Sequence, residues 1–492
     1  MPLIIHHVQP GLKPLPIIFR PWLLRVVHWF VPLLLRVRVR PWLPSGISRI
    51  EAKNPEILVD LLAQFQANQI RLILAFRHVE VDDPLCGLYL FSRIIPKTAK
   101  RQGVNLKLPL HTHFLYDRGM PLWGGKGLGW ILSHIGGISL HRGKTPDWHA
   151  LKSARRLAVE GTLPMTVAPE GATNGYSEYL GDMEPGVAQL GFWCAEDLMR
   201  KGKPPDVWIV PIGLYYTYPR PAWDKLDHLM SQLEHSAGLP PYAQPKAPET
   251  RQEDWYKDRL LRLSTHLLEK MEAFYQRFYH CSLVPTPPES RQSGQKDGSD
   301  LAPASQSLAP DARSSSLDQR LQTLLDTALR VAESYFGVSS RGTLSERCRR
   351  VEEAAWSYIY RADVSQRTAL PPLERGLGDW IAAEASLRSL HMRLVESLVS
   401  VHENYITEHP SFMRLAETTL LMFDVMARIR GDRYPPRPRL GDRHAHFTIC
   451  QPIPLHPLLA QYQADRQGAK AAVTQLTQML QTALQGTLPP ST

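Results

Sequence analysis

Short apolar runs alternate with amphipathic segments through residues 51–218, and this alternation constrains the fold more than any other feature. Apolar runs of four to ten residues bounded by turn signals predict strands, and the segments between them predict helices. The expected strands are residues 71–76, 111–116, 138–141, 165–168 and 207–216. Helices are expected to begin at Asp83, Asp147 and near Pro185, because Asp is a favoured N-cap and Pro is favoured in the first turn. The sequence therefore predicts an α/β domain.

The composition changes sharply after this region. Residues 285–316 are rich in Pro, Ser, Gly, Asp and Gln and have almost no large apolar side chains, which predicts a disordered linker. Apolar residues then recur at helical spacing from Leu317 and stop at Gly337. Further helices are expected at about 344–363, 373–407, 411–430 and 468–485. The predicted division is a basic segment (1–50), an α/β domain (51–284), a linker (285–316) and a mainly α-helical C-terminal domain of unassigned role (317–492).

The first 50 residues hold seven Lys and Arg residues, and no acidic residue occurs before Glu51. The apolar stretch 23–35 is interrupted by Arg25, His28 and Pro32 and would reach about 20 Å as a helix, whereas a bilayer core is about 30 Å thick. Several of its apolar residues share one helical face: Leu23, Val26, Val27, Phe30, Leu33 and Leu34. We expect an amphipathic helix that lies in the surface of an anionic membrane, the alternative being a helix packed on its own domain.

Composition excludes several classes of protein. The 492 residues carry five scattered cysteines without a C-x-x-C pair, which argues against a disulfide scaffold or a zinc ribbon and suits a reducing, cytoplasmic compartment. His111 and His113 are interpreted as structural residues, so no metal site is expected. The net charge of +10 is concentrated at the N-terminus rather than in a stripe with aromatic residues, so no nucleic-acid partner is expected.

One segment carries a chemical signature, His78-Val-Glu-Val-Asp-Asp83. The histidine follows a predicted strand, and the aspartate five positions later caps the next helix, so one loop can bring the two side chains together. A carboxylate bonded to one ring nitrogen leaves the other nitrogen able to take a proton from a hydroxyl. Taken alone, the spacing fits a general base as well as a loop histidine beside an N-cap.

Four segments in order make the region of residues 60–220 resemble the glycerolipid acyltransferase family, of the lysophosphatidic acid acyltransferase type. The family's N-H-x4-D block corresponds to Arg77, His78 and Asp83, and its G-x-x-F-x-x-R block corresponds in part to Gly136, Ser139 and Arg142. Its F-P-E-G-T-R-S block corresponds in part to the segment Ala168-Pro-Glu170-Gly171-Ala-Thr-Asn174, and its fourth block to Ile209-Val-Pro211-Ile-Gly213. The resemblance implies a central mixed sheet flanked by helices.

The resemblance also implies roles for individual residues. His78 would be the general base and Asp83 its orienting carboxylate, while Gly136, Arg142, Glu170 and Gly171 would bind the acceptor, Arg142 through a phosphate. The reaction would move a fatty acyl group from acyl-carrier protein or coenzyme A to the hydroxyl of a membrane lysolipid such as 1-acylglycerol-3-phosphate. It needs no cofactor beyond this acyl donor, and the enzyme would lie peripherally on the cytoplasmic side of a membrane.

Departures from the family pattern leave two alternatives open. Ser139 replaces an aromatic residue, His141 an acidic residue and Glu80 a serine, while Ala172, Thr173 and Asn174 replace Thr-Arg-Ser. The missing arginine removes an expected phosphate contact, which makes a neutral lipid alcohol an alternative acceptor. A catalytically decayed membrane scaffold is the other alternative, and the presence of His78 and Asp83 argues against it.

Overall fold

The computed structural model describes residues 5–38, 43, 45–141, 147–243, 252–283, 316–432 and 436–489. Two sequence predictions therefore lie outside the described residues: Arg142, and the linker 285–316 except for Ser316, which caps the following helix.

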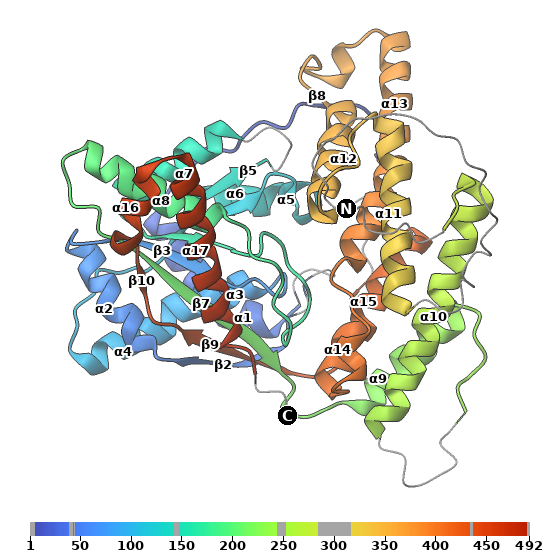
Figure 1. Cartoon of the computed structure of the whole chain (residues 1–492), viewed down its shortest axis with the longest axis horizontal. Coiled ribbons are helices and arrows are strands. Elements are labelled where there is room, and N and C mark those ends of the chain that lie inside the picture. The colour runs from blue at the N-terminus through green and yellow to red at the C-terminus, as the bar shows by residue number, and fades with distance from the viewer. Residues whose placement is uncertain are drawn as a thin grey trace, which may run out of the picture.

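An eight-stranded mixed sheet forms the centre of the molecule, in the order β2-β9-β7-β3-β6-β4-β5, with β10 paired to β7 (Figure 1). The strands are β2 (Ile47–Lys53), β3 (Arg71–Phe76), β4 (His113–Asp117), β5 (Gly137–Leu140), β6 (Met165–Val167), β7 (Val207–Thr217), β9 (Arg443–Ile449) and β10 (Ile453–Pro454). The five strands from β3 to β7 are mutually parallel, so their carboxyl ends share one edge, which here is called the carboxyl edge. The five strands predicted from sequence are confirmed, with ends that differ from the prediction by at most two residues.

Helices cover both faces of this sheet. One face carries α1 (Pro21–Arg36), α2 (Pro55–Gln66), α3 (Asp83–Tyr89), the π-helical turn η1 (Leu90–Ile94) and α4 (Ile95–Gln102). The other carries α7 (Trp148–Glu160), α8 (Gly186–Arg200), α16 (His456–Ala464) and α17 (Arg466–Gln485). Asp147 caps α7 by accepting a hydrogen bond from the Ala150 amide at 3.1 Å, as expected from the sequence. Two short helices, α5 (Met120–Gly124) and α6 (Lys126–His134), precede β5.

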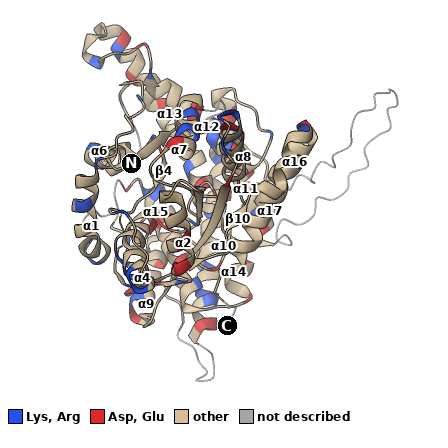
Figure 2. Ribbon diagram, turned by 90° about the vertical axis from the view of Figure 1, so that its left-hand side faces the viewer, with Lys and Arg blue, Asp and Glu red and all other residues tan. Residues whose placement is uncertain are grey.

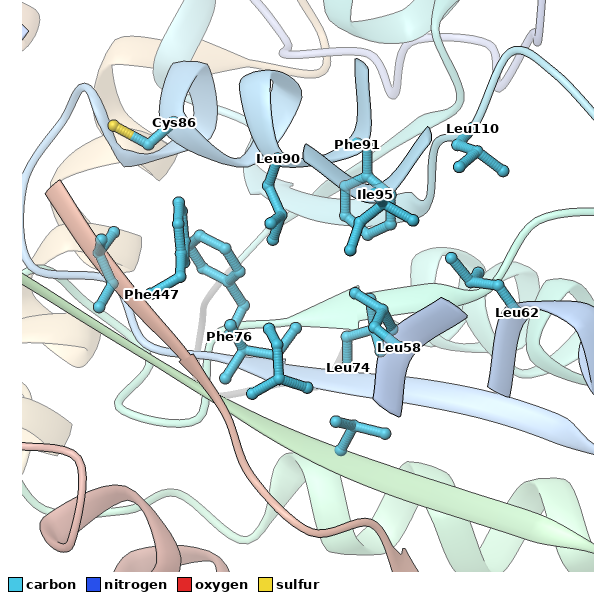
Figure 3. Packing of buried hydrophobic residues seen from close by; sticks show 14 of the residues in the cluster. Leu58, Leu62, Leu74, Phe76, Cys86, Leu90, Phe91, Ile95, Leu110 and Phe447 are labelled. Carbon is cyan, nitrogen blue, oxygen red and sulfur yellow. The ribbon is translucent and has the colours of Figure 1, made fainter. Parts of the chain in front are cut away.

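The side chains of β3 alternate between these two layers, as a strand buried on both faces requires. Leu74 and Phe76 point toward α2, α3 and η1 and pack with Leu58, Leu90 and Phe447 (Figure 3). Ile73 and Ala75 belong to the opposite cluster with α7 and α8. Continuous burial of this kind accounts for the unbroken apolar run of the sequence.

The remaining helices form a separate layer beside the carboxyl edge (Figure 1). They are α9 (Trp223–Ser236), α10 (Gln252–Tyr279), α11 (Leu317–Phe336), α12 (Leu344–Ile359), α13 (Pro372–Leu398), α14 (Asn404–Thr407) and α15 (Phe412–Arg430), with a 3-10 turn η2 (Arg367–Ala369). A two-residue strand β1 (Gln9–Pro10) pairs with β8 (Tyr360–Arg361). Gly337 ends α11 at a φ of +64°, a conformation that glycine adopts without strain. A helical C-terminal region is thus confirmed.

The expected domain boundary at the linker does not match this packing. The helices α9 and α10, which precede the linker, pack in the helical layer, whereas the late strand β9 lies inside the sheet between β2 and β7. The prediction that residues 317–492 form a separate helical domain is therefore wrong for the last fifty residues. Burial explains β9: Arg443, Ala445, Phe447 and Ile449 alternate with less buried neighbours, which is the period of a strand.

The helix predicted near the N-terminus is present as α1 and is partly buried. Leu24, Val31 and Leu35 are buried in the domain, so one side of the helix packs on its own domain, as the alternative interpretation expected. Leu23 lies on this buried side, not with Val26, Phe30 and Leu33, which are exposed. Within the described ranges, no helix combines the length and apolar character that crossing a bilayer requires.

The place of β9 in the sheet predicts the effect of one substitution. Phe447→Ala should lower the free energy of unfolding by about 3–5 kcal/mol, because Phe447 is almost fully buried against Phe76 and the removed ring leaves a cavity. Chemical denaturation measures the change. Leu373→Ala on α13, whose side chain is 75% exposed, is the control and should change stability by less than about 0.5 kcal/mol. Equal effects of the two substitutions would contradict the burial of β9.

Candidate active site at the carboxyl edge of the sheet

The loop after β3 joins His78 to Asp83 as the sequence predicts. Nδ1 of His78 lies 3.0 Å from Oδ2 of Asp83, and the same oxygen accepts hydrogen bonds from the amides of Val79 at 2.5 Å and Glu80 at 2.9 Å. Asp83 is fully buried, whereas the His78 side chain is 27% exposed. A carboxylate only accepts, so Nδ1 carries the proton and Nε2 is the basic nitrogen.

Tyr216, near the end of β7, holds the second oxygen of the carboxylate by donating its hydroxyl hydrogen to Oδ1 of Asp83. Burial and the nearby Asp83 raise the pKa of Tyr216 well above its ordinary value, so the hydroxyl keeps its proton. The guanidinium of Arg443 lies 4.7 Å from the centroid of the Tyr216 ring and pairs with Asp82 at 2.5 Å. A strand from the end of the chain thus supports the loop that holds His78.

Glu80, which replaces the serine of the family pattern, pairs with another late arginine. Its carboxylate oxygens accept hydrogen bonds from Nη1 of Arg437 at 2.8 and 3.1 Å. Nε of Arg437 also lies 3.2 Å from Asp424 on α15. The charge of Glu80 is therefore balanced by a residue far away in sequence, and the departure has a structural explanation.

Glu170 and Gly171 follow β6, which is parallel to β3, so they reach the carboxyl edge beside His78. Oε1 of Glu170 accepts hydrogen bonds from the Gly181 amide at 2.9 Å and from the Asn174 side chain at 3.1 Å. Burial raises the pKa of Glu170, and the positive charge of Arg77 opposes this shift. The amide of Gly175 donates to the carbonyl of Val79 at 3.0 Å, which joins the two loops directly.

Gly171 needs to be glycine for two reasons. Its φ is +73°, and a Cβ at this position would lie 2.2 Å from Oε1 of Glu184. Arg349 of α12 pairs with this same Glu184 carboxylate. The loop after β6 is therefore in contact with the helical layer.

Arg77 occupies the position of the family's asparagine and is completely buried. Its Nη atoms donate to the carbonyl oxygens of Tyr176, Ser177, Tyr179 and Leu214 over 2.6–2.9 Å. Three of these carbonyls belong to the loop that follows Glu170, so Arg77 holds that loop against β7. Asn174, which stands in place of the family's serine, also has a structural part, because its side chain donates to the Tyr179 carbonyl at 2.9 Å.

The helical layer closes over the carboxyl edge. Glu417 of α15 accepts hydrogen bonds from the Ser177 amide at 2.9 Å and from the Tyr405 hydroxyl at 2.7 Å, and its carboxyl group is buried. Trp356 of α12 stacks on His141 at a centroid distance of 5.3 Å. The helical C-terminal region, whose role the sequence leaves unassigned, therefore packs against the loops around His78.

Gly136, another predicted acceptor residue, is not brought to His78. Gly136 precedes β5 and lies at the amino end of that strand, where its carbonyl contacts Nδ1 of His113 at 2.9 Å. The four residues of β5 place it about 13 Å from the carboxyl edge. Ser139 lies within β5, and Arg142 is outside the described residues.

The two histidines near β4 are packed as structural residues. The pKa of His111 is lowered to about 3, mainly by burial, and its ring packs against Phe19 and Phe114. Burial likewise lowers the pKa of His113. In the part of the chain that the structure describes, no group of three His, Cys, Asp or Glu side chains could hold a metal ion.

Sequence reasoning missed Tyr216, Arg443, Arg437 and Glu417. Tyr216 carries a weak signal, because a tyrosine near the end of a buried strand needs a hydrogen-bond partner. The other three lie more than 300 residues from His78 in sequence, and no spacing links them to it. A scan against protein-family models finds no match, and a search of curated proteins finds none either.

The buried Glu417 predicts how stability depends on pH. Burial raises its pKa from 4.5 to about 7, so the folded protein binds more protons than the unfolded chain between these values. The free energy of unfolding should therefore fall by about 3 kcal/mol as pH rises from 4.5 to 7 on account of this group alone.

Glu417→Gln should remove that part of the pH dependence. Chemical denaturation of both proteins at a series of pH values measures the difference in slope. Glu408→Gln, an exposed position at the end of α14 in the same layer, is the control. Parallel curves for the wild type and Glu417→Gln would show that Glu417 is ionised in the folded protein.

Proposed function

We propose that this chain is an O-acyltransferase that moves a fatty acyl group from a coenzyme A or acyl-carrier-protein thioester to the hydroxyl of a lysolipid, such as 1-acylglycerol-3-phosphate. The observation that carries the proposal is the pairing of a partly exposed His78 with a buried Asp83. Glu170 and Gly171 lie beside this pair, in the arrangement that the family resemblance implies for the acceptor.

The chemistry requires one proton acceptor and one electrophile. Nε2 of His78 takes the proton of the lipid hydroxyl as its oxygen attacks the thioester carbonyl, and Asp83 stabilises the imidazolium that forms. The C–S bond then breaks, and the thiolate leaves with the proton from His78. Each step uses groups already in place, and no acyl-enzyme intermediate is needed.

His78→Ala should reduce acyl transfer by about 10²- to 10⁴-fold, because the base is lost while the fold is kept. Purified protein is incubated with labelled acyl-coenzyme A or acyl-carrier protein and a panel of lysolipids and neutral lipid alcohols, and product is measured by thin-layer chromatography. His149→Ala, an exposed histidine on α7, is the matched control and should keep full activity.

The same assay separates the alternatives. If product formed only with neutral lipid alcohols, the acceptor would be a neutral alcohol and not a lysolipid. Activity of His78→Ala equal to the wild type would refute the general base. No product from any pair, with folded protein bound to vesicles, would favour a membrane scaffold.

We further propose that α1 attaches the protein peripherally to the cytoplasmic surface of a membrane. The helix lies at the edge of the molecule beside α6, and backbone hydrogen bonds from Ile18 and Arg20 to the end of α6 fix its approach (Figure 2). Large apolar side chains project from its outer side: Trp22, Val26, Trp29, Phe30, Leu33 and Val37. Arg25 and Arg36 are exposed on the same helix. An exposed apolar face with arginines suits an anionic bilayer surface.

Replacing Trp29 and Phe30 together by Ala should weaken binding to anionic vesicles by tenfold or more, because both rings would otherwise enter the interface. Co-sedimentation with phosphatidylglycerol vesicles measures the affinity. Trp380→Ala on α13 is the control, since Trp380 is 71% exposed and Trp29 is 72% exposed. Raised salt should weaken binding of the wild type as well. Unchanged vesicle binding by the double variant would exclude this face of α1 as the attachment.

A further inference from the structure

A basic cleft of about 510 Å³ opens where the last strands of the sheet meet the helical layer. Its polar lining comes from four places in the chain: Ser48 in β2, Arg220 after β7, Lys225 in the first turn of α9, and Arg439, Asp442 and His444 around the start of β9. The four-block resemblance includes none of these residues.

The charges of the cleft are unbalanced. Arg220, Lys225 and Arg439 are permanent cations, whereas Asp442 is the one carboxylate of the lining. Arg220 and Lys225 are exposed, and among the described residues no ion pair with Asp or Glu holds either side chain. Both are therefore able to turn toward an anion without giving up an existing partner.

The walls of the cleft are set by close backbone packing. Gly441 has a φ of +132°, and a Cβ there would lie 3.3 Å from the Tyr218 ring and 3.5 Å from the Arg220 carbonyl. Nη2 of Arg439 donates to the carbonyl of Arg36 at 2.6 Å and to Oγ of Ser45 at 3.0 Å. The cleft is thus connected to the end of α1, the helix proposed to lie on the membrane.

The cleft is also connected to the His78–Asp83 pair. His444 is paired with Thr217 in the ladder between β9 and β7. The residue before Thr217 is Tyr216, whose hydroxyl donates to Asp83. Arg443, between Asp442 and His444, pairs with Asp82. The cleft therefore lies at the same sheet edge as His78, beyond the end of β7.

We propose that this cleft binds a phosphomonoester. Two exposed cations, Arg220 and Lys225, and the Arg439 guanidinium held by Arg36 and Ser45 provide the charge and the several N–H donors that a phosphate dianion takes up. If the proposed acyltransferase activity holds, the phosphate belongs either to the lipid acceptor or to the coenzyme A donor. The cations of the cleft would then make the phosphate contact that the family's missing arginine would otherwise make. Only this choice of source rests on the proposed function; the phosphate binding itself does not.

The first test measures binding without turnover. Inorganic phosphate is titrated into the full-length protein at low salt by isothermal calorimetry, for the wild type and for the double variant Arg220→Ala/Lys225→Ala. We expect the double variant to bind phosphate at least tenfold more weakly. Lys203→Ala, an exposed lysine after α8, is the control and should match the wild type. Equal phosphate affinity in the wild type and the double variant, or no saturable binding by the wild type, would overturn the proposal.

The second test identifies the source of the phosphate. Phosphatidate vesicles are compared with phosphatidylcholine vesicles, and coenzyme A is compared with its form lacking the 3′-phosphate. A preference for phosphatidate that the double variant loses assigns the cleft to the lipid, and a lost preference for the 3′-phosphate assigns it to the donor. Phosphate binding that depends on Arg220 and Lys225, without any His78-dependent acyl transfer, would support the cleft as a phosphate site and contradict the acyltransferase activity. If the double variant retained both preferences, the proposal that this cleft binds the phosphate would be contradicted.

Discussion

The carboxylate of Asp83 is the point on which the site depends. A fully buried negative charge is stable only when its oxygens are occupied by donors, and here His78, two backbone amides and Tyr216 supply them. These donors come from the loop after β3 and from β7, so the carboxylate holds the loop and the sheet in register. The His78 side chain is 27% exposed, and its hydrogen bond to Asp83 uses Nδ1 and leaves Nε2 as the basic nitrogen.

The late residues of the chain maintain this arrangement. Strand β9 completes the sheet between β2 and β7, and its first residue, Arg443, pairs with Asp82 beside the carboxylate. Arg437 neutralises Glu80, and Glu417 holds the loop that follows Glu170. The helical layer and the last strands are thus part of the structure around His78, and a boundary drawn at residues 285–316 would divide it.

Sequence periodicity predicted the local elements where burial is simple. The run at residues 71–76 is a strand buried on both faces, and Asp147 caps α7 as its position before a helical repeat implies. Strands β2 and β9 were missed, although Arg443 to Ile449 alternates in burial with a period of two. The reason is that β9 is surrounded in sequence by helices, and its partners Tyr215 and Glu51 are more than 200 residues away.

By itself, the sequence determined which residues a single loop can join. The H-x4-D spacing brought His78 to Asp83, and the strand-to-turn position of Glu170 brought it to the same edge, because both depend only on neighbouring residues and on parallel strands. Only the tertiary structure decided that Tyr216 and Arg443 support the carboxylate, and that a basic cleft opens beside β9. These features require segments far apart in sequence to pack together, and their contacts leave no periodic signal in the chain.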